Sequence, residues 1–147
     1  MHYRVVADQA APSMVRRRLK AWLTALGWPP EPAEDLILVV SEAFANVVDH
    51  AYPPETAGWA RLCAHQHRDA DGRCRVVLLV TDQGRWRPAP LDRGYRGRGI
   101  TLMRALTESL DITSTGQGTQ LLLTSYPVAA GASLLAAAGA SLLAAAS

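Results

Sequence analysis

Lysine is almost absent from this chain of 147 residues, in which Lys20 is the only lysine among 15 basic residues. Chemistry that needs a lysine, such as a phosphate-binding P-loop or a Schiff base, therefore has one candidate, and it lies far from any glycine-rich loop. This shortage argues against a Walker-type ATPase and against most aldolase-like chemistry. The 15 basic and 13 acidic residues nearly balance, so no overall field directs the chain to nucleic acid or to a membrane.

Cysteine is scarce as well. Cys63 and Cys74 are too few for a zinc site of their own or for a dense disulfide framework. They flank a predicted turn at residues 69–72, where a cross-strand disulfide is geometrically conceivable. Two buried thiols in a cytoplasmic protein are the favoured alternative. The N-terminus shows no signal-peptide pattern, which also favours the cytoplasm.

The composition predicts one globular domain followed by a tail. Hydrophobic residues make up 49% of the chain and charged residues 19%, and this length suffices for one buried core. The segment AGASLLAA at residues 130–137 is repeated at residues 138–145. Alanine and glycine give it too little hydrophobicity for a membrane span, which needs about 20 apolar residues. We assign residues 1–128 to the domain and expect residues 129–147 to form a loosely attached helix or a disordered appendage without assigned function, in preference to a membrane or oligomer contact.

The hydrophobic pattern predicts the element order β-α-α-β-β-loop-α-β-β. Strands are expected at residues 3–7, 59–67, 74–81, 111–115 and 119–126, and helices at residues 12–26, 31–50 and 100–110. The run at residues 76–80 is apolar on both faces, which predicts a central strand. Because strands and helices do not alternate, we expect an α+β fold, a two-layer sandwich with an antiparallel or mixed, mostly antiparallel sheet and helices on one face.

Apolar stripes predict the buried face of each helix. The first stripe consists of Val15, Leu19, Trp22 and Leu26, the second of Leu36, Val39, Val40, Ala43 and Val47, and the third of Leu102, Met103 and Leu106. Four basic residues, at positions 16–18 and 20, lie mostly on the other face of the first helix. We interpret them as a solvated face, with a docking patch as the alternative.

Glu42 and Asn46 form the first group of residues suited to nucleotide chemistry. They are four positions apart, so their side chains stack on one face of an otherwise apolar helix. An asparagine oxygen is a neutral ligand for Mg²⁺, and a glutamate one turn away can accept a proton from an attacking hydroxyl. Such a pair alone is more often simply solvated, so its interpretation depends on the accompanying segments.

The second group follows the predicted central strand. Asp82 at the strand end can accept a hydrogen bond from a ligand amino group, and Gly84 lets the backbone approach that ligand. An ordinary Asx turn is the alternative interpretation.

The third group opens the last predicted helix. Glycines before a helix expose backbone N–H groups toward an anion, and residues 85–104 contain six arginines but only one acid, Asp92. This charge favours phosphate binding over a merely solvated loop. The segment that precedes the helix reads Arg96, Gly97, Arg98 and Gly99.

The order and spacing of these groups, with a Gly-Thr pair at residues 118–119, resemble the N, G1, G2 and final Gly-Thr motifs of the Bergerat-fold ATPases, the superfamily of histidine kinases, gyrase and Hsp90. The stretch S-E-A-x-x-N-x-x-x-H-A-Y at residues 41–52 is most similar to the small bacterial anti-sigma-factor serine/threonine kinases. The resemblance covers residues 3–128 and implies the Bergerat ATP-binding fold.

The resemblance also implies a role for each matching residue. Glu42 corresponds to the catalytic base, Asn46 to the residue that holds Mg²⁺, and Asp82 to the acid that reads the adenine amino group. His50 matches a motif position, and a functional or a structural role for it stays open. The remaining implied nucleotide-binding residues are Gly84 beside the acid, Thr119 near the adenine, Gly97 and Gly99 over the phosphates, and Arg93, Arg96 and Arg98 as candidates for contact with the γ-phosphate.

The activity implied by the resemblance is Mg²⁺-ATP-dependent phosphorylation of a serine or threonine. The implied partners are an anti-sigma-factor antagonist of the STAS class and a sigma factor, in a partner switch, and a homodimer is expected by analogy. We expect no direct contact with nucleic acid or membrane. Trp86 stands where many relatives have the second glycine of D-x-G-x-G, which keeps open a non-catalytic ATP-binding regulator. A nucleic-acid binder that uses the arginines of residues 85–104 is the third alternative.

Overall fold

The computed structural model describes residues 1–53, 56, 58–84 and 98–129. Its elements follow the predicted order, and their bounds agree with the predicted ones to within two residues except at the end of the last helix. They are β1 (His2–Val6), α1 (Ala11–Leu26), α2 (Pro30–His50), β2 (Trp59–Arg68), β3 (Cys74–Asp82), α3 (Arg98–Leu106), β4 (Ser109–Thr115) and β5 (Gly118–Thr124).

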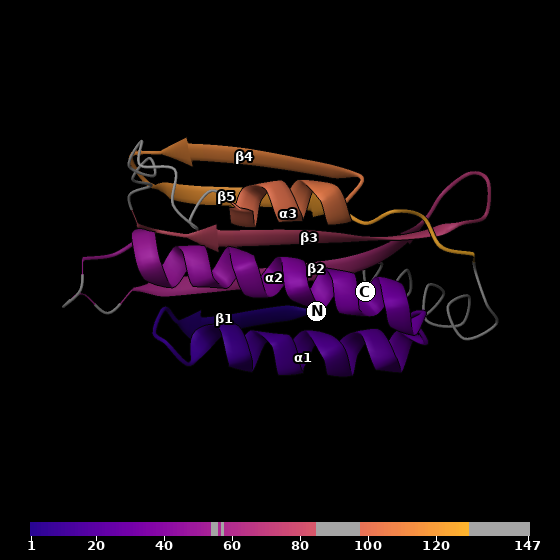
Figure 1. The fold of residues 1–147 in the computed structure, drawn as a ribbon, viewed down its shortest axis with the longest axis horizontal. Coiled ribbons are helices and arrows are strands. Elements are labelled where there is room, and N and C mark those ends of the chain that lie inside the picture. Colours follow the sequence, from indigo (N-terminus) through magenta and orange to yellow (C-terminus); the bar gives the residue numbers. More distant parts are fainter. Residues whose placement is uncertain (54–55, 57, 85–97, 130–147) are drawn as a thin grey trace, which may run out of the picture.

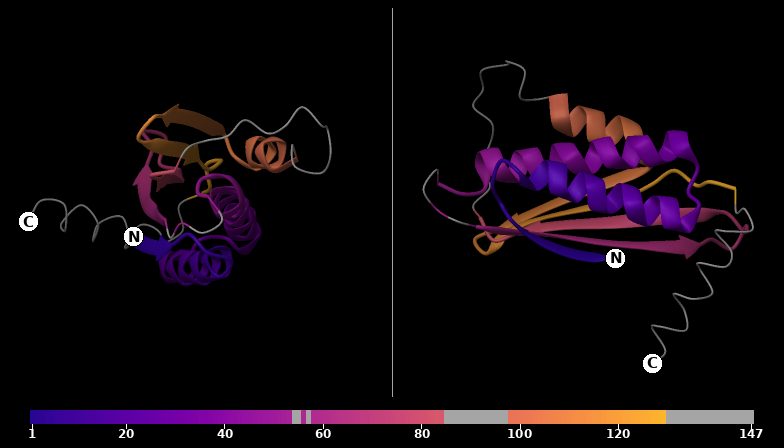
Figure 2. Two further views of the ribbon diagram at one scale, coloured as in Figure 1. Left: turned by 90° about the vertical axis from the view of Figure 1, so that its left-hand side faces the viewer. Right: turned by 90° about the horizontal axis from the view of Figure 1, so that it is seen from below.

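The five strands form one sheet in the order β1-β2-β3-β5-β4, and all four pairings are antiparallel. β3 lies in the middle, as its apolar run predicts. In Figure 1, α1 and α2 lie side by side over the sheet and run along its strands, and α3 lies over β5. Figure 2 shows all three helices on the same face. The predicted two-layer α+β sandwich is therefore confirmed, and its sheet is entirely antiparallel.

The core fills the space between the helices and the sheet. Alternate residues of β3, from Cys74 to Asp82, are buried, while those between them are half-buried, because the helices cover only one face of the sheet. The second predicted stripe is entirely buried, and Phe44 joins it. The other stripes are confirmed in part. Trp22 and Leu26 pack at the core margin, whereas Leu102 is half-buried and Ile100 packs against the core instead.

The prediction that the last helix extends to residue 110 is wrong. α3 ends at Leu106, and the hydroxyl of Thr107 donates a hydrogen bond to the carbonyl oxygen of Met103 at 2.6 Å. Two residues later β4 begins, and Leu110 pairs with Leu123 of β5. The leucine spacing suits a helix, but pairing with β5 places residues 109 and 110 in the sheet.

The end of α1 is confirmed where the sequence predicts it. Gly27 adopts the left-handed conformation with φ of 71°, and its N–H donates to the carbonyl oxygen of Thr24. The arginines at positions 16–18 and Lys20 are exposed, as expected of a solvated face. Lys20 lies 3.2 Å from Glu34 on α2, and both side chains are largely exposed, so this ion pair contributes little to stability.

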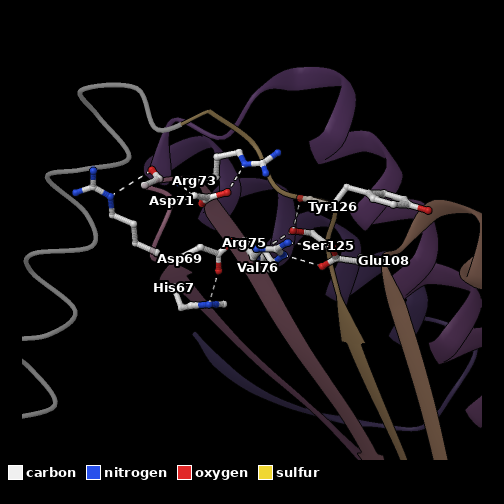
Figure 3. A network of polar contacts seen from close by, with 11 residues as sticks. His67, Asp69, Asp71, Arg73, Arg75, Val76, Glu108, Ser125 and Tyr126 are labelled. Carbon is white, nitrogen blue, oxygen red and sulfur yellow. Dashed lines mark hydrogen bonds and ion pairs between the residues drawn. The ribbon is translucent and has the colours of Figure 1, made fainter.

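A network of charged side chains lies at the end of the sheet where β3 begins (Figure 3). Arg75 donates two hydrogen bonds to Glu108, at 2.6 and 2.9 Å, and also contacts Asp69, which lies 2.7 Å from His67. The Arg75 guanidinium lowers the pKa of the Glu108 carboxyl. Asp82 lies at the opposite end of β3, so this network is structural and remote from the candidate site.

Both cysteines are free thiols. Cys63 pairs with Leu79 in the sheet and Cys74 with Arg68, so the two cysteines do not face each other. Only Cys74 is buried, whereas Cys63 is half-buried, which corrects the expectation of two buried thiols. In the part of the chain that the structure describes, no helix is both long and apolar enough to cross a membrane. The repeat at residues 130–145 lies outside the described residues.

Candidate nucleotide-binding site

Glu42 and Asn46 lie in the second half of α2, where the first turn of α3 packs against it. Both side chains are half-buried. A β-carbon built on Gly99 would lie 3.1 Å from Glu42 Oε2 and 3.6 Å from Asn46 Nδ2. Residue 99 therefore lies directly against the side chains of Glu42 and Asn46. Because it is a glycine, it places no side chain between its backbone and that pair. The structure brings together three residues that the sequence analysis singled out from two separate segments.

Asn46 also faces a second group of candidate residues. A cavity of about 10 Å³ lies between α2 and the sheet, and its walls include Asn46, His50, Asp82 and Thr119. This volume holds about one water molecule, so the cavity itself is smaller than a purine base. Asn46 thus lies between the pair formed by Glu42 and Gly99 and the pair formed by Asp82 and Thr119.

The carboxylate of Asp82 is buried and held by backbone groups. Its Oδ1 accepts a hydrogen bond from the N–H of Gly84 at 2.8 Å, and the backbone N–H of Thr119 also bonds to the carboxylate. Burial raises the pKa of Asp82, and these two hydrogen bonds oppose that shift. A fixed carboxylate accepts hydrogen bonds only, so its remaining lone pairs suit a ligand that donates one, such as an amino group.

Thr119 is the cross-strand partner of Asp82 in the pairing of β3 with β5. Its Oγ1 is buried and has no hydrogen-bond partner among the described residues. A buried polar atom without a partner costs about 1–3 kcal/mol, and a ligand with a polar edge would supply the missing partner. An acceptor carboxylate beside an unpaired hydroxyl fits the amino group and ring nitrogens of adenine, so these residues fit the nucleotide that the family resemblance implies.

Two glycines allow the backbone around Asp82 to pack closely. A β-carbon on Gly84 would lie 2.1 Å from the carbonyl oxygen of Ala51, and one on Gly118 would lie 2.0 Å from the carbonyl oxygen of Asp82. Gly118 also has φ of 138°, a conformation that other residues rarely adopt. The sequence predicts that Gly84 lets the backbone approach a ligand, and the structure adds that Gly84 makes room for the end of α2.

A larger groove, of about 400 Å³, lies at the same end of the sheet and shares Asp82 with the candidate site. Its walls include Arg4, Trp59 and Arg61, and the Arg4 guanidinium stacks on the Trp59 ring at 4.1 Å. Neither Glu42 nor Thr119 lines this groove. Size alone therefore does not locate the candidate site, whereas the convergence of its polar groups does.

The candidate residues of the arginine-rich segment are described only in part. Arg98 is the first residue of α3 and is exposed. Trp86, Arg93, Arg96 and Gly97 lie outside the described residues. Among the residues that the structure does describe, no three histidine, cysteine, aspartate or glutamate side chains cluster as a metal site. Among the described residues, Asn46 would hold Mg²⁺ together with oxygens that a nucleotide brings.

This chain, with three helices on one face of a five-stranded antiparallel sheet and a polar pocket between α2 and that sheet, has the Bergerat ATP-binding fold. The chain belongs to the histidine kinase-like ATPase domain family, whose model matches residues 5–125.

Comparison with individual proteins gives a curated relative and a solved structure. Over 71 residues the chain is 37% identical to the serine-protein kinase RsbW of Halalkalibacterium halodurans, a match that covers 48% of this chain and 40% of that protein. The matched region thus spans less than half of the relative. The crystal structure of the RsbU and RsbW domains of Rv1364c from Mycobacterium tuberculosis matches 86% of this chain and 32% of that chain, with a TM-score of 0.62 and 22% identity. This second similarity shows the fold.

Proposed function

We propose that this chain is a Mg²⁺-ATP-dependent serine/threonine protein kinase that acts as an anti-sigma factor. The observation that carries the proposal is the position of Asn46 on α2, with Glu42 and Gly99 on one side and the Asp82–Thr119 pair on the other. In this proposal the phosphates bind at the end of the site formed by Glu42 and Gly99, and the adenine binds at the end formed by Asp82 and Thr119. The 37% identity to a serine-protein kinase supports the same activity.

The adenine end of the site works by hydrogen bonding. Asp82 accepts a hydrogen bond from the adenine amino group on the lone pairs that Gly84 and Thr119 leave free. The Thr119 hydroxyl pairs with the polar edge of the base and so gains the partner that it lacks. Both contacts orient the nucleotide so that its phosphates extend toward Asn46.

The phosphate end of the site works by positioning and charge. Bound Mg²⁺-ATP supplies the γ-phosphoryl group and the cation that neutralises it. Asn46 would hold the magnesium, and Glu42 would accept the proton of the partner's serine or threonine hydroxyl. Backbone N–H groups near Gly97 and Gly99 and the arginines Arg93, Arg96 and Arg98 stabilise the phosphate charge.

The proposed partners follow from the family resemblance. The phosphorylated partner is an anti-sigma-factor antagonist of the STAS class, and a sigma factor is sequestered once the antagonist is phosphorylated. The proposal includes a homodimer and a cytoplasmic location, and it includes no direct contact with nucleic acid or membrane.

The alternative function is a regulatory module that binds ATP and a sigma factor or STAS partner but transfers no phosphate. Trp86, which replaces a glycine of the G1 motif, favours this alternative. Glu42 favours the kinase, because a module that only binds nucleotide needs no base beside its phosphate-binding residues.

Calorimetric titration of Mg²⁺-ATP and Mg²⁺-ADP into the purified chain tests the proposed site. We expect micromolar, Mg²⁺-dependent binding that is lost in Asn46→Ala. Transfer of labelled phosphate to a STAS-domain partner then separates kinase from regulator, with Glu42→Ala as the inactive control. No binding at high protein concentration would reject the nucleotide site, and binding without transfer to any STAS partner would favour the regulator.

A further inference from the structure

Tyr52, the last residue of the motif at residues 41–52, connects three segments of the chain. It lies two residues after the end of α2. Its hydroxyl donates a hydrogen bond to the carbonyl oxygen of Trp59 at 2.6 Å and accepts one from the N–H of Gln83 at 2.9 Å. A phenol hydroxyl can donate and accept at once, and Tyr52 uses both capacities. The end of α2, the start of β2 and the segment after β3 are thereby tied together.

The hydrogen bond to Gln83 acts on the turn that holds the Asp82 carboxylate. Gln83 lies between Asp82 and Gly84, and the N–H of Gly84 donates to Asp82 Oδ1. Two consecutive N–H groups are therefore fixed, one by Tyr52 and the next by Asp82 itself. If the peptide at Gln83 rotates, the N–H of Gly84 turns away and the carboxylate loses one of the bonds that orient it.

Close packing leaves Tyr52 little freedom to move. A β-carbon on Gly58 would lie 2.1 Å from the Tyr52 ring carbon Cζ. The residue before Tyr52, Ala51, places its carbonyl oxygen where a β-carbon on Gly84 would be. The position of the hydroxyl is thus limited by Gly58, which lies against the ring, and by Gly84, which lies against the backbone of the preceding residue.

We propose that Tyr52 is a positioning residue for the recognition of adenine, because it holds the Asp82–Gly84 turn in the conformation in which the carboxylate faces the base. This inference rests on the proposed function, in which Asp82 accepts a hydrogen bond from the adenine amino group. Tyr52 itself touches no part of the nucleotide in this scheme.

The test compares ATP with inosine triphosphate, which has a carbonyl oxygen in place of the adenine amino group. Dissociation constants of both Mg²⁺ complexes are measured by calorimetry for the wild type, Tyr52→Phe and the control Tyr126→Phe, whose ring is exposed. We expect Tyr52→Phe to lower the preference for ATP about tenfold, mainly by weakening ATP binding, and Tyr126→Phe to leave the preference unchanged. Equal weakening of both ligands in Tyr52→Phe would mean a merely structural role and would overturn the inference.

Gly58→Ala provides an independent second variant if Tyr52→Phe does not fold. It keeps the hydroxyl but displaces the ring that carries it, so it too should lower the ATP preference. An ATP preference that is unchanged in the folded variants, beside a wild type that prefers ATP, overturns only the role of Tyr52. A wild type that binds neither nucleotide overturns the proposed function and this inference with it.

Discussion

Gly99 at the start of α3 lies directly against Glu42 on α2, so that a β-carbon at position 99 would be 3.1 Å from Glu42 Oε2. This contact joins the beginning of α3 to the proposed catalytic base. A glycine is favoured at position 99 for a steric reason, because a larger side chain would push the Glu42 carboxylate away. The proposed chemistry at this contact leads to the first prediction.

Glu42→Gln is expected to separate binding from catalysis. The amide has the size of the carboxylate but cannot take up a proton, so phosphate transfer should fall at least about 100-fold, the lower range for loss of a general base. The dissociation constant for Mg²⁺-ATP should stay within about threefold, because the bonds to base and phosphate remain. Single-turnover transfer to a STAS partner and calorimetry measure the two effects. A wild-type transfer rate would remove Glu42 from the role of base.

Thr119→Val is expected to have opposite effects on the free and the bound protein. Its hydroxyl is buried without a partner among the described residues, so the nearly isosteric valine should leave the melting temperature of the free protein unchanged or raise it. The same substitution removes a contact to the base and should weaken ATP binding about tenfold. Thermal unfolding with and without Mg²⁺-ATP checks both effects. A variant that is destabilised without nucleotide would show that the hydroxyl is already satisfied.

Gly118→Ala is expected to destabilise the fold, with Gly116→Ala in the same turn as its matched control. At Gly118 a β-carbon would lie 2.0 Å from the carbonyl oxygen of Asp82 at φ of 138°, whereas at Gly116 nothing lies within 4 Å. The loss should exceed about 1 kcal/mol in the free energy of unfolding for Gly118→Ala. The control should change it by less than about 0.5 kcal/mol. Urea unfolding measures both, and equal effects would contradict the close contact.

Glu108→Gln is expected to change how stability depends on pH. The Arg75 guanidinium lowers the pKa of Glu108 from 4.5, so the folded state favours the ionised carboxylate. Its stabilisation is complete above pH 4.5 and is lost as pH falls through the lowered pKa. The melting temperature of the variant should therefore lie below that of the wild type at pH 7 and approach it at low pH. A difference that does not vary with pH would contradict this linkage.

Much of the fold could be predicted because local patterns determine local structure. The leucine and valine stripes of α1 and α2 fix the buried helix faces, and Gly27 ends α1 where its backbone turns left-handed. The end of α3 could not be predicted in this way. Leu106 and Leu110 are four residues apart, as on a helix, but pairing with Leu123 draws Leu110 into the sheet.

The candidate site, too, could be predicted from the sequence only in part. Its residue types and their spacing were readable, including the stacking of Glu42 and Asn46 on one helix face. The role of Tyr52 left no separate signal, because its two hydrogen bonds join Trp59 and Gln83, which belong to other segments. The packing of Gly84 on Ala51 was equally hidden, since it depends on where α2 ends relative to β3.

The sequence by itself determined the order of the elements, the buried faces of the helices and the residues that chemistry could use. Those properties depend on neighbours a few positions apart along the chain, which helical and strand periodicity fixes directly. Only the tertiary structure decided that Asp82 pairs with Thr119 and that Gly99 lies on Glu42. These relationships depend on the register between strands and on the packing of one helix against another, and both are set by the burial of the whole core.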